Sequence, residues 1–158
     1  MNKYLQLSKY SRNCPRGFLD KVKNIKTSRG GKRHVIEILE LIRGEFDSRK
    51  FKTSYTNNFK KSRFISVKNV LKKRQRSCGS MATVVASVMR NLGYPTKLIN
   101  GFYVKEKDDM RHAWNEIYIE GGWFPFDVTR KNFKIGKYHV KKDEWVDWED
   151  LEKVYKPK

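Results

Sequence analysis

The amino-acid sequence predicts an α+β domain, with helices in the first half and an antiparallel β-sheet in the second. Apolar residues recur at helical spacing in 33–46 and crowd 78–92, whereas 111–120 alternates with a period of two. Helices followed by hairpin-linked strands are typical of α+β folds rather than of alternating α/β folds. The length of 158 residues fits one domain, so we treat 1–158 as a single unit.

Three helices are expected before the sheet. Residues 33–46 place apolar side chains at positions i, i+3, i+4 and i+7, which gives one buried face. A shorter helix over 67–73 follows Ser66, whose hydroxyl can cap its first turn. The third helix, 78–92, is apolar around most of its circumference, and Gly93 ends it. That composition predicts a central, buried helix.

The sheet is predicted from three strands. Residues 97–104 form the first, and 111–120 and 123–128 form a hairpin that turns at 121–122, where two glycines are adjacent. The acidic segment 143–152 carries tryptophan and leucine at helical spacing. We expect it to form a helix that folds back onto the basic first half of the chain.

The charge is distributed unevenly. Residues 1–77 hold 22 lysines and arginines against 5 acidic residues, whereas 78–158 hold 14 against 12. A basic region of this size attracts polyanions such as nucleic acid, although a solvated lysine-rich surface explains the same composition equally well. The candidates for polyanion binding are Lys60, Lys61, Arg63, Lys72, Lys73, Arg74 and Arg76.

The sequence also indicates the setting in which the chain works. No apolar run reaches the length of a membrane helix, and the N-terminus lacks the apolar core of a signal peptide. We therefore expect no membrane span, a cytoplasmic location, and free thiols at Cys14 and Cys78. Segment 1–31 is basic and rich in turn signals, which predicts loose order. The three histidines and two cysteines lack zinc-ligand spacing, so no metal is expected.

One cysteine has the surroundings of a nucleophile. Cys78 opens a predicted helix after several basic residues, and both features favour the thiolate. His112 and Asp127 lie on the two strands of the predicted hairpin, where a carboxylate within side-chain reach can orient the imidazole. Residue 127 should face residue 116, with a small offset bringing it towards His112. Backbone N–H groups at the helix start can serve as oxyanion donors. Each residue also has an ordinary structural explanation, Cys78 as a small core residue above all.

The sequence around these residues resembles the transglutaminase-like superfamily. RSCGSMATVVASVMRNLGYPTKLINGFYV is similar to its nucleophile helix, and HAWNEIYIEGGWFPFDVT to its histidine strand, turn and aspartate. The two blocks occupy about 78–129, which we expect to hold the catalytic core motifs. The resemblance implies a papain-like fold with Cys78 as nucleophile, His112 as general base and acid, and Asp127 as its orienting partner. Trp114 and Ser77, which replaces the glycine usual before the cysteine, become substrate-cleft candidates.

The resemblance implies a cysteine enzyme that acts on amide bonds of a protein or peptide through a thioester, without a cofactor. We expect hydrolysis or deamidation rather than cross-linking, because the sequence lacks a calcium-binding loop. The alternative is a noncatalytic or hybrid module of the same fold that binds nucleic acid or another polyanion through its basic half. Attachment to acidic polymers or lipid surfaces is a third option, which the absence of a secretion signal disfavours.

Overall fold

The computed structural model describes residues 2–48, 51–53, 63–104 and 110–155. Strands β3, β4, β5 and β6 form one antiparallel sheet in the order β5-β4-β3-β6, and β1 pairs with β2 in a small parallel sheet. The helices are α1 (Arg16–Lys23), α2 (Lys32–Ser48), α4 (Val67–Lys73), α5 (Cys78–Asn91) and α6 (Trp148–Tyr155), with short 3₁₀ helices at η1 (Asn2–Leu5) and η2 (Lys131–Phe133). The strands are β1 (Lys52–Thr53), β2 (Gln75–Arg76), β3 (Thr96–Tyr103), β4 (Met110–Ile119), β5 (Gly122–Phe126) and β6 (His139–Trp145).

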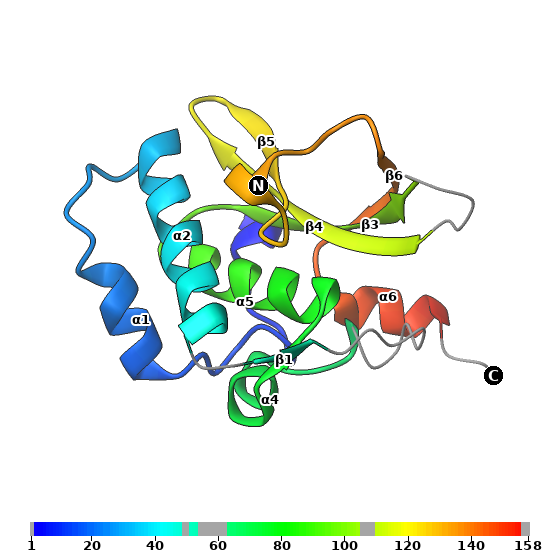
Figure 1. The fold of residues 1–158 in the computed structure, drawn as a ribbon, viewed down its shortest axis with the longest axis horizontal. Helices are drawn as coiled ribbons and strands as arrows, with labels where there is room; N and C mark the ends of the chain where they lie inside the picture. The colour runs from blue at the N-terminus through cyan, green and yellow to red at the C-terminus, as the bar shows by residue number, and fades with distance from the viewer. Residues whose placement is uncertain (1, 49–50, 54–62, 105–109, 156–158) are drawn as a thin grey trace.

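Helix α5 is the centre of the molecule. Figure 1 shows it against the sheet, with α1 and α2 on one side and α6 on the other. Every residue from 79 to 90 is buried, which is why the sequence of this helix is apolar on all faces. The predicted α+β class and the predicted central helix are therefore confirmed, and the helix ends one residue earlier than expected.

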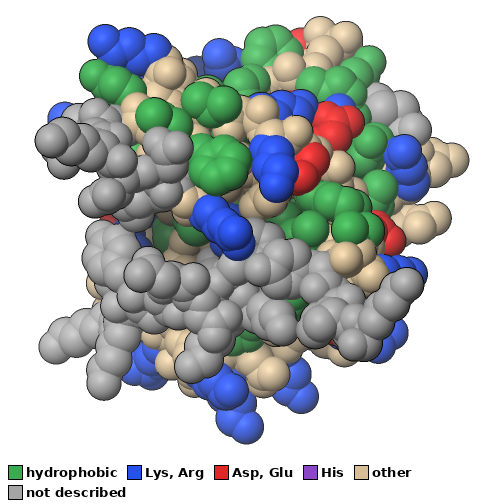
Figure 2. All heavy atoms as spheres, turned by 90° about the vertical axis from the view of Figure 1, so that its right-hand side faces the viewer, with side chains coloured by type: hydrophobic (Ala, Val, Ile, Leu, Met, Phe, Trp, Pro, Cys, Tyr) green, Lys and Arg blue, Asp and Glu red, His purple; other side chains and the backbone are tan. Residues whose placement is uncertain are grey.

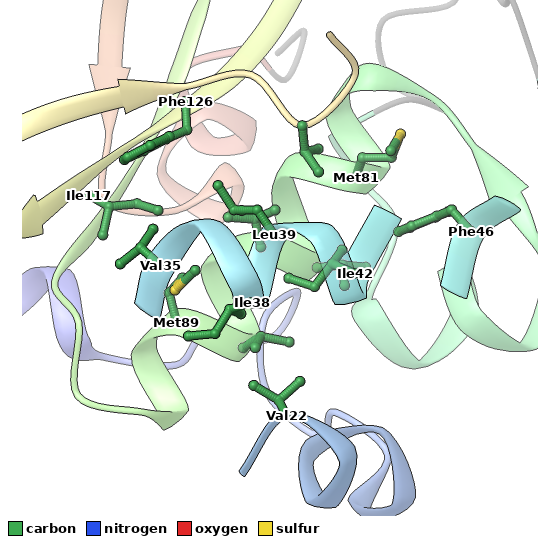
Figure 3. Packing of buried hydrophobic residues seen from close by; sticks show 14 of the residues in the cluster. Val22, Val35, Ile38, Leu39, Ile42, Phe46, Met81, Met89, Ile117 and Phe126 are labelled. Carbon is green, nitrogen blue, oxygen red and sulfur yellow. The ribbon is translucent and has the colours of Figure 1, made fainter. Parts of the chain in front are cut away.

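The main hydrophobic core lies between α2, α5 and the sheet (Figure 3). The predicted apolar face of α2 is fully buried, with Ile38 and Leu39 at its centre. Met81 and Met89 enter the same core from α5, and Ile117 enters it from β4. This packing presses α5 onto the sheet and so fixes where the first residue of that helix lies.

The β4–β5 hairpin turns one residue earlier than predicted. Ile119 pairs with Gly122, so the two turn residues are Glu120 and Gly121. Both have positive φ, 52° and 82°, as a type I′ turn requires. Glu116 consequently faces Pro125 instead of residue 127. The earlier turn advances β5 by two residues along β4, which carries the end of β5 towards His112.

The acidic C-terminal segment divides into a strand and a helix. Its first residues, Asp143 to Trp145, belong to β6, which pairs with β3 at the edge of the sheet. The prediction of one continuous helix over 143–152 was therefore wrong. The rest forms α6, whose Trp148 is fully buried. The expected return to the basic half does occur, since Lys9 forms an ion pair with Glu152 at 3.2 Å.

The N-terminal segment contains more regular structure than the turn signals of 1–31 predicted. Helix α1 buries Phe18 and Val22 in the main core, and that apolar pair outweighs the polar character of the surrounding sequence. The helices predicted over 33–46 and 67–73 are confirmed as α2 and α4. Helix α4 begins after Ser66, whose Oγ accepts a hydrogen bond from the Asn69 N–H. Among the described residues, no helix is long and apolar enough to span a membrane.

Gly101 is a point of close packing in the sheet. It pairs with His112 across β3 and β4, and a Cβ at this position would lie 2.7 Å from the Trp114 ring and even closer to the Val140 carbonyl oxygen. We predict that Gly101→Ala lowers the free energy of unfolding by about 1–3 kcal/mol, the usual effect of overpacking. Urea denaturation measures this change. Gly44→Ala is the matched control, because open space surrounds that helical position and alanine should stabilise α2 by about 0.5–1 kcal/mol.

Candidate active site

Cys78 is the first residue of α5, and its position depends on a double cap. The Ser77 side chain accepts a hydrogen bond from the Ser80 N–H, and the Ser80 hydroxyl accepts one from the Ser77 N–H. This capping box holds the first turn of the helix in place. Ser77, a predicted cleft residue, thus has a defined structural task at the start of the helix. Cys78 itself is partly exposed, whereas the helix behind it is buried.

The imidazole of His112 joins two of the predicted residues. Its Nε2 lies 2.6 Å from Asp127 Oδ2, and both side chains are buried. His112 comes from β4 and Asp127 follows the end of β5, so the two-residue advance of the hairpin brings them together. With Nε2 engaged, Nδ1 is the ring nitrogen that remains for the thiol.

Hydrogen bonds and charge hold the Asp127 carboxylate in its ionised form. The N–H and the hydroxyl of Thr129 donate to Oδ1 at 3.0 and 2.6 Å, and His139 lies 2.8 Å from Oδ2. Burial would raise the pKa of Asp127, but the hydrogen bond and charge of His112, helped by these donors, lower it to about 2. The carboxylate is therefore a fixed negative partner for the imidazole.

The surroundings of Cys78 and His112 favour a thiolate beside an imidazolium. Burial opposes ionisation of the thiol, but the hydrogen bond to His112 and the positive charges of Arg63 and His112 lower the pKa of Cys78 to about 6. Burial likewise disfavours the imidazolium, yet hydrogen bonds to Asp127 and Cys78 raise the pKa of His112 to about 9. The arrangement therefore favours an ionised sulfur and a protonated ring near neutral pH.

Cys14 gives the contrast within the same chain. Neither Cys14 nor Cys78 is in a disulfide, but burial raises the pKa of Cys14 to about 11. An uncharged thiol in an apolar site is a packing residue, with little nucleophilic character. Of the two cysteines, only Cys78 has the electrostatic surroundings of a nucleophile.

His139 is a member of the site that the sequence did not reveal. Its Nδ1 accepts a hydrogen bond from the Gly136 N–H at 3.1 Å, so Nε2 carries the proton and donates to Asp127. The aspartate therefore receives an imidazole N–H from each of two strands, β4 and β6. No local motif surrounds His139, and only the pairing of β6 with β3 places it there.

Two predicted site residues are in the interior. Arg63, proposed for polyanion binding, is only 2% exposed, and its Nη1 lies 3.9 Å from Cys78 Sγ, so its charge serves the site instead of the surface. Trp114 is 3% exposed and packs against His112 and His139, with ring centroids 6.0 and 5.3 Å apart. It supports the imidazoles from beneath, and a residue this buried does not line an open cleft.

The remaining basic candidates fall into three groups. Lys72, Lys73 and Arg74 are exposed at the end of α4, and Arg76 forms an ion pair with Asp47. Lys60 and Lys61 lie outside the described residues. On the face shown in Figure 2, lysine and arginine side chains are interspersed with apolar and uncharged ones. The described candidates therefore offer one short exposed cluster, 72–74, beside the start of α5.

His112, Asp127 and His139 also form a group of the composition that binds metal ions. Their ligand atoms lie within 4.8 Å of one another. The two nitrogen–oxygen distances, 2.6 and 2.8 Å, are those of hydrogen bonds that carry protons. A metal ion would displace both protons and withdraw His112 from Cys78, so we assign this group to proton sharing.

The fold, in which a helix that begins at a cysteine packs on an antiparallel sheet, is that of a transglutaminase-like core. Residues 20–128 match the sequence profile of the transglutaminase-like superfamily core, so the chain belongs to the transglutaminase-like superfamily. No match was found among curated proteins.

A solved structure with the same fold gives a direct comparison. It is a crystal structure described as a putative cysteine protease from Cytophaga hutchinsonii, with a TM-score of 0.71 and 21% sequence identity. The match covers 93% of this chain and 47% of that one, so this chain spans about half the length of the protein it resembles. The resemblance confirms the predicted architecture of a transglutaminase-like core.

The low pKa of Asp127 predicts a specific acid sensitivity. Because this carboxyl binds its proton more weakly in the folded chain than in the unfolded one, its contribution is present above about pH 4 and is lost as the pH falls through about 2. We predict that wild type loses about 2 kcal/mol more stability than Asp127→Asn between pH 5 and pH 2. Urea denaturation at both pH values measures the difference. Equal losses in the two proteins would show that Asp127 is not held ionised by folding.

Proposed function

We propose that the protein is a cysteine enzyme that hydrolyses amide bonds of a protein or peptide, in the backbone or in a glutamine side chain. The observation that carries the proposal is the position of Cys78 at the start of α5 in surroundings that favour its thiolate, with His112 hydrogen-bonded to Asp127 beside it. A structural cysteine gains nothing from a lowered pKa, whereas a thiol nucleophile needs one.

The first half-reaction forms a thioester. The Cys78 thiolate attacks the carbonyl carbon, a C–S bond forms and the carbonyl electron pair moves to oxygen. The developing oxyanion lies by the positive N-terminal end of α5, which packs on the sheet. The C–N bond then breaks as His112 donates its proton to the leaving nitrogen, and a free amine or ammonia departs.

Hydrolysis of the thioester returns the enzyme to its starting state. Neutral His112 takes a proton from water, which attacks the thioester carbonyl. The C–S bond breaks, the acid leaves and the thiolate–imidazolium pair is restored. Throughout, Asp127 keeps the ring oriented and stabilises its charged form. An amine in place of water would give a cross-link by the same steps, so the acyl acceptor decides the product.

The reaction is identified by the mass changes it produces. Lysate proteins incubated with wild type or Cys78→Ala should differ by new chain cleavages, by +1 Da deamidations or by lysine–glutamine cross-links. We expect cleavage or deamidation with wild type alone. Cys14→Ala is the matched control and should behave as wild type, because that thiol is buried and not ionised. Identical spectra for wild type and Cys78→Ala would contradict a catalytic role for Cys78.

The two shifted pKa values predict a bell-shaped pH dependence of kcat/KM. Activity should rise near pH 6, as the Cys78 thiol ionises, and fall near pH 9, as His112 loses the proton that the leaving amine requires. His112→Ala should lower kcat/KM by about 10²–10⁴-fold. Hydrolysis of a peptide substrate found by mass spectrometry measures both effects. A rate that climbs steadily to pH 10 would show an ordinary, unactivated thiol.

The exposed cluster 72–74 supports a second activity, binding of a polyanion beside the catalytic site. We expect duplex DNA of arbitrary sequence to bind with an affinity that falls steeply as salt rises. Replacing Lys72, Lys73 and Arg74 by glutamine should reduce the slope of log K against log salt by up to about three, about one per lost phosphate contact. Replacing the exposed Lys131, Lys134 and Lys137 removes the same charge and serves as the control. Equal effects of the two triple variants would indicate attraction by net charge alone.

A further inference from the structure

Arg63 is buried beside the nucleophile, where a permanent charge has a high energetic cost unless it is paired. Its guanidinium is held on two sides. Nε and Nη2 both donate to Asn100 Oδ1, at 3.2 and 3.1 Å, and the group lies over the ring of Trp148 at 5.5 Å. With these contacts in place, Nη1 is directed to Cys78 Sγ at 3.9 Å.

The residues that hold this guanidinium are themselves fixed. Asn100 is buried in β3, the central strand next to β4, and pairs with Ala113, the neighbour of His112. Trp148 is fully buried, and its Nε1 donates to Thr83 Oγ1 in α5 at 2.9 Å. The orientation of Arg63 is therefore set by the sheet and by the helix that carries Cys78.

We propose that Arg63 is a second cationic partner of the Cys78 thiolate, with a charge that stabilises the ionised sulfur whatever the protonation state of His112. This inference rests on the proposed function, because it assigns a further catalytic residue to that site. His112 must lose its proton in each cycle, whereas a guanidinium keeps its charge. The thiolate is then stabilised by one partner that moves protons and one that does not.

The charges around the pair are consistent with this role. The sulfur faces His112 from β4 and Arg63 from the other side, and Asp127 and His139 lie behind the imidazole. Arg111 and Asp143 act on Arg63 with opposite signs. The charge of Arg63 is the second largest influence, after the His112 hydrogen bond, among those that lower the pKa of Cys78.

The test is the pH dependence of Cys78 alkylation by iodoacetamide, followed by mass spectrometry of the Cys78 peptide. In the wild type we expect a midpoint near pH 6. Arg63→Met retains a long, flexible side chain but removes the charge. It should raise the midpoint by about one to three pH units. His112→Ala should leave a lower midpoint than the double variant does, and the double variant should titrate above free cysteine, because burial then acts with neither cationic partner present.

Controls separate charge from folding. Lys68→Met removes one exposed positive charge from α4 and should leave the midpoint unchanged. Cys14 in the same digests reports on general opening of the structure, because its raised pKa keeps it slow to react while the fold is intact. If Arg63→Met does not fold, Arg63→Lys and Asn100→Ala decide, since each weakens the directed contact and should raise the midpoint by a smaller amount.

The outcomes distinguish this inference from the proposed function. A wild-type midpoint equal to that of free cysteine overturns the proposed function and the role of Arg63 together. A low wild-type midpoint that every folded Arg63 and Asn100 variant retains overturns the role of Arg63 alone. A midpoint that rises in those variants, with no change in Lys68→Met, supports the inference even before a substrate is known.

Discussion

The burial of α5 is the constraint on which the rest of the structure depends. A helix enclosed by α2, the sheet and α6 has no freedom to slide or rotate, because every face is packed. Its last turn is tied as well, since the buried Arg90 pairs with Asp147 at 3.3 Å and donates to the Thr96 carbonyl. The partly exposed sulfur at the other end inherits this rigidity, so a reactive atom is held still without any cross-link.

The charged groups of the site differ in how readily they exchange a proton. Asp127 stays ionised, Arg63 stays cationic, and His112 and Cys78 between them carry the protons that move. When the sulfur is acylated, the buried guanidinium loses an anionic neighbour. Return of the thiolate then restores that pairing, which makes the sulfur a better leaving group in the second half-reaction. In the proposed mechanism, this pairing favours breakdown of the acyl-enzyme.

Local sequence patterns predicted the elements whose reasons are local. Ser66 caps α4 as expected, and the apolar run after Cys78 forms the buried helix. The predicted hairpin turn was one residue too late. Adjacent glycines at 121–122 favoured a turn there, but Glu120 itself adopts the left-handed conformation. Strand β6 is polar and lies at an edge, so its sequence lacks the alternation that marks a half-buried strand. His139 reaches the site through the pairing of β6 with β3, and Arg63 reaches it through its hydrogen bonds to Asn100. Neither contact could be predicted from the spacing of residues along the chain.

The register of the β4–β5 hairpin has a consequence for how this site can be gained or lost. Each residue of a strand advances the chain by about 3.3 Å, so a turn displaced by one position shifts the end of β5 by two residues, about 6.6 Å along β4. The carboxylate and the imidazole would then be separated by more than a hydrogen bond can span, although the sheet and both cores would remain. A change at the loop tip that moves the turn by one position can therefore convert an enzyme of this architecture into an inert scaffold, with every catalytic side chain still present in the sequence.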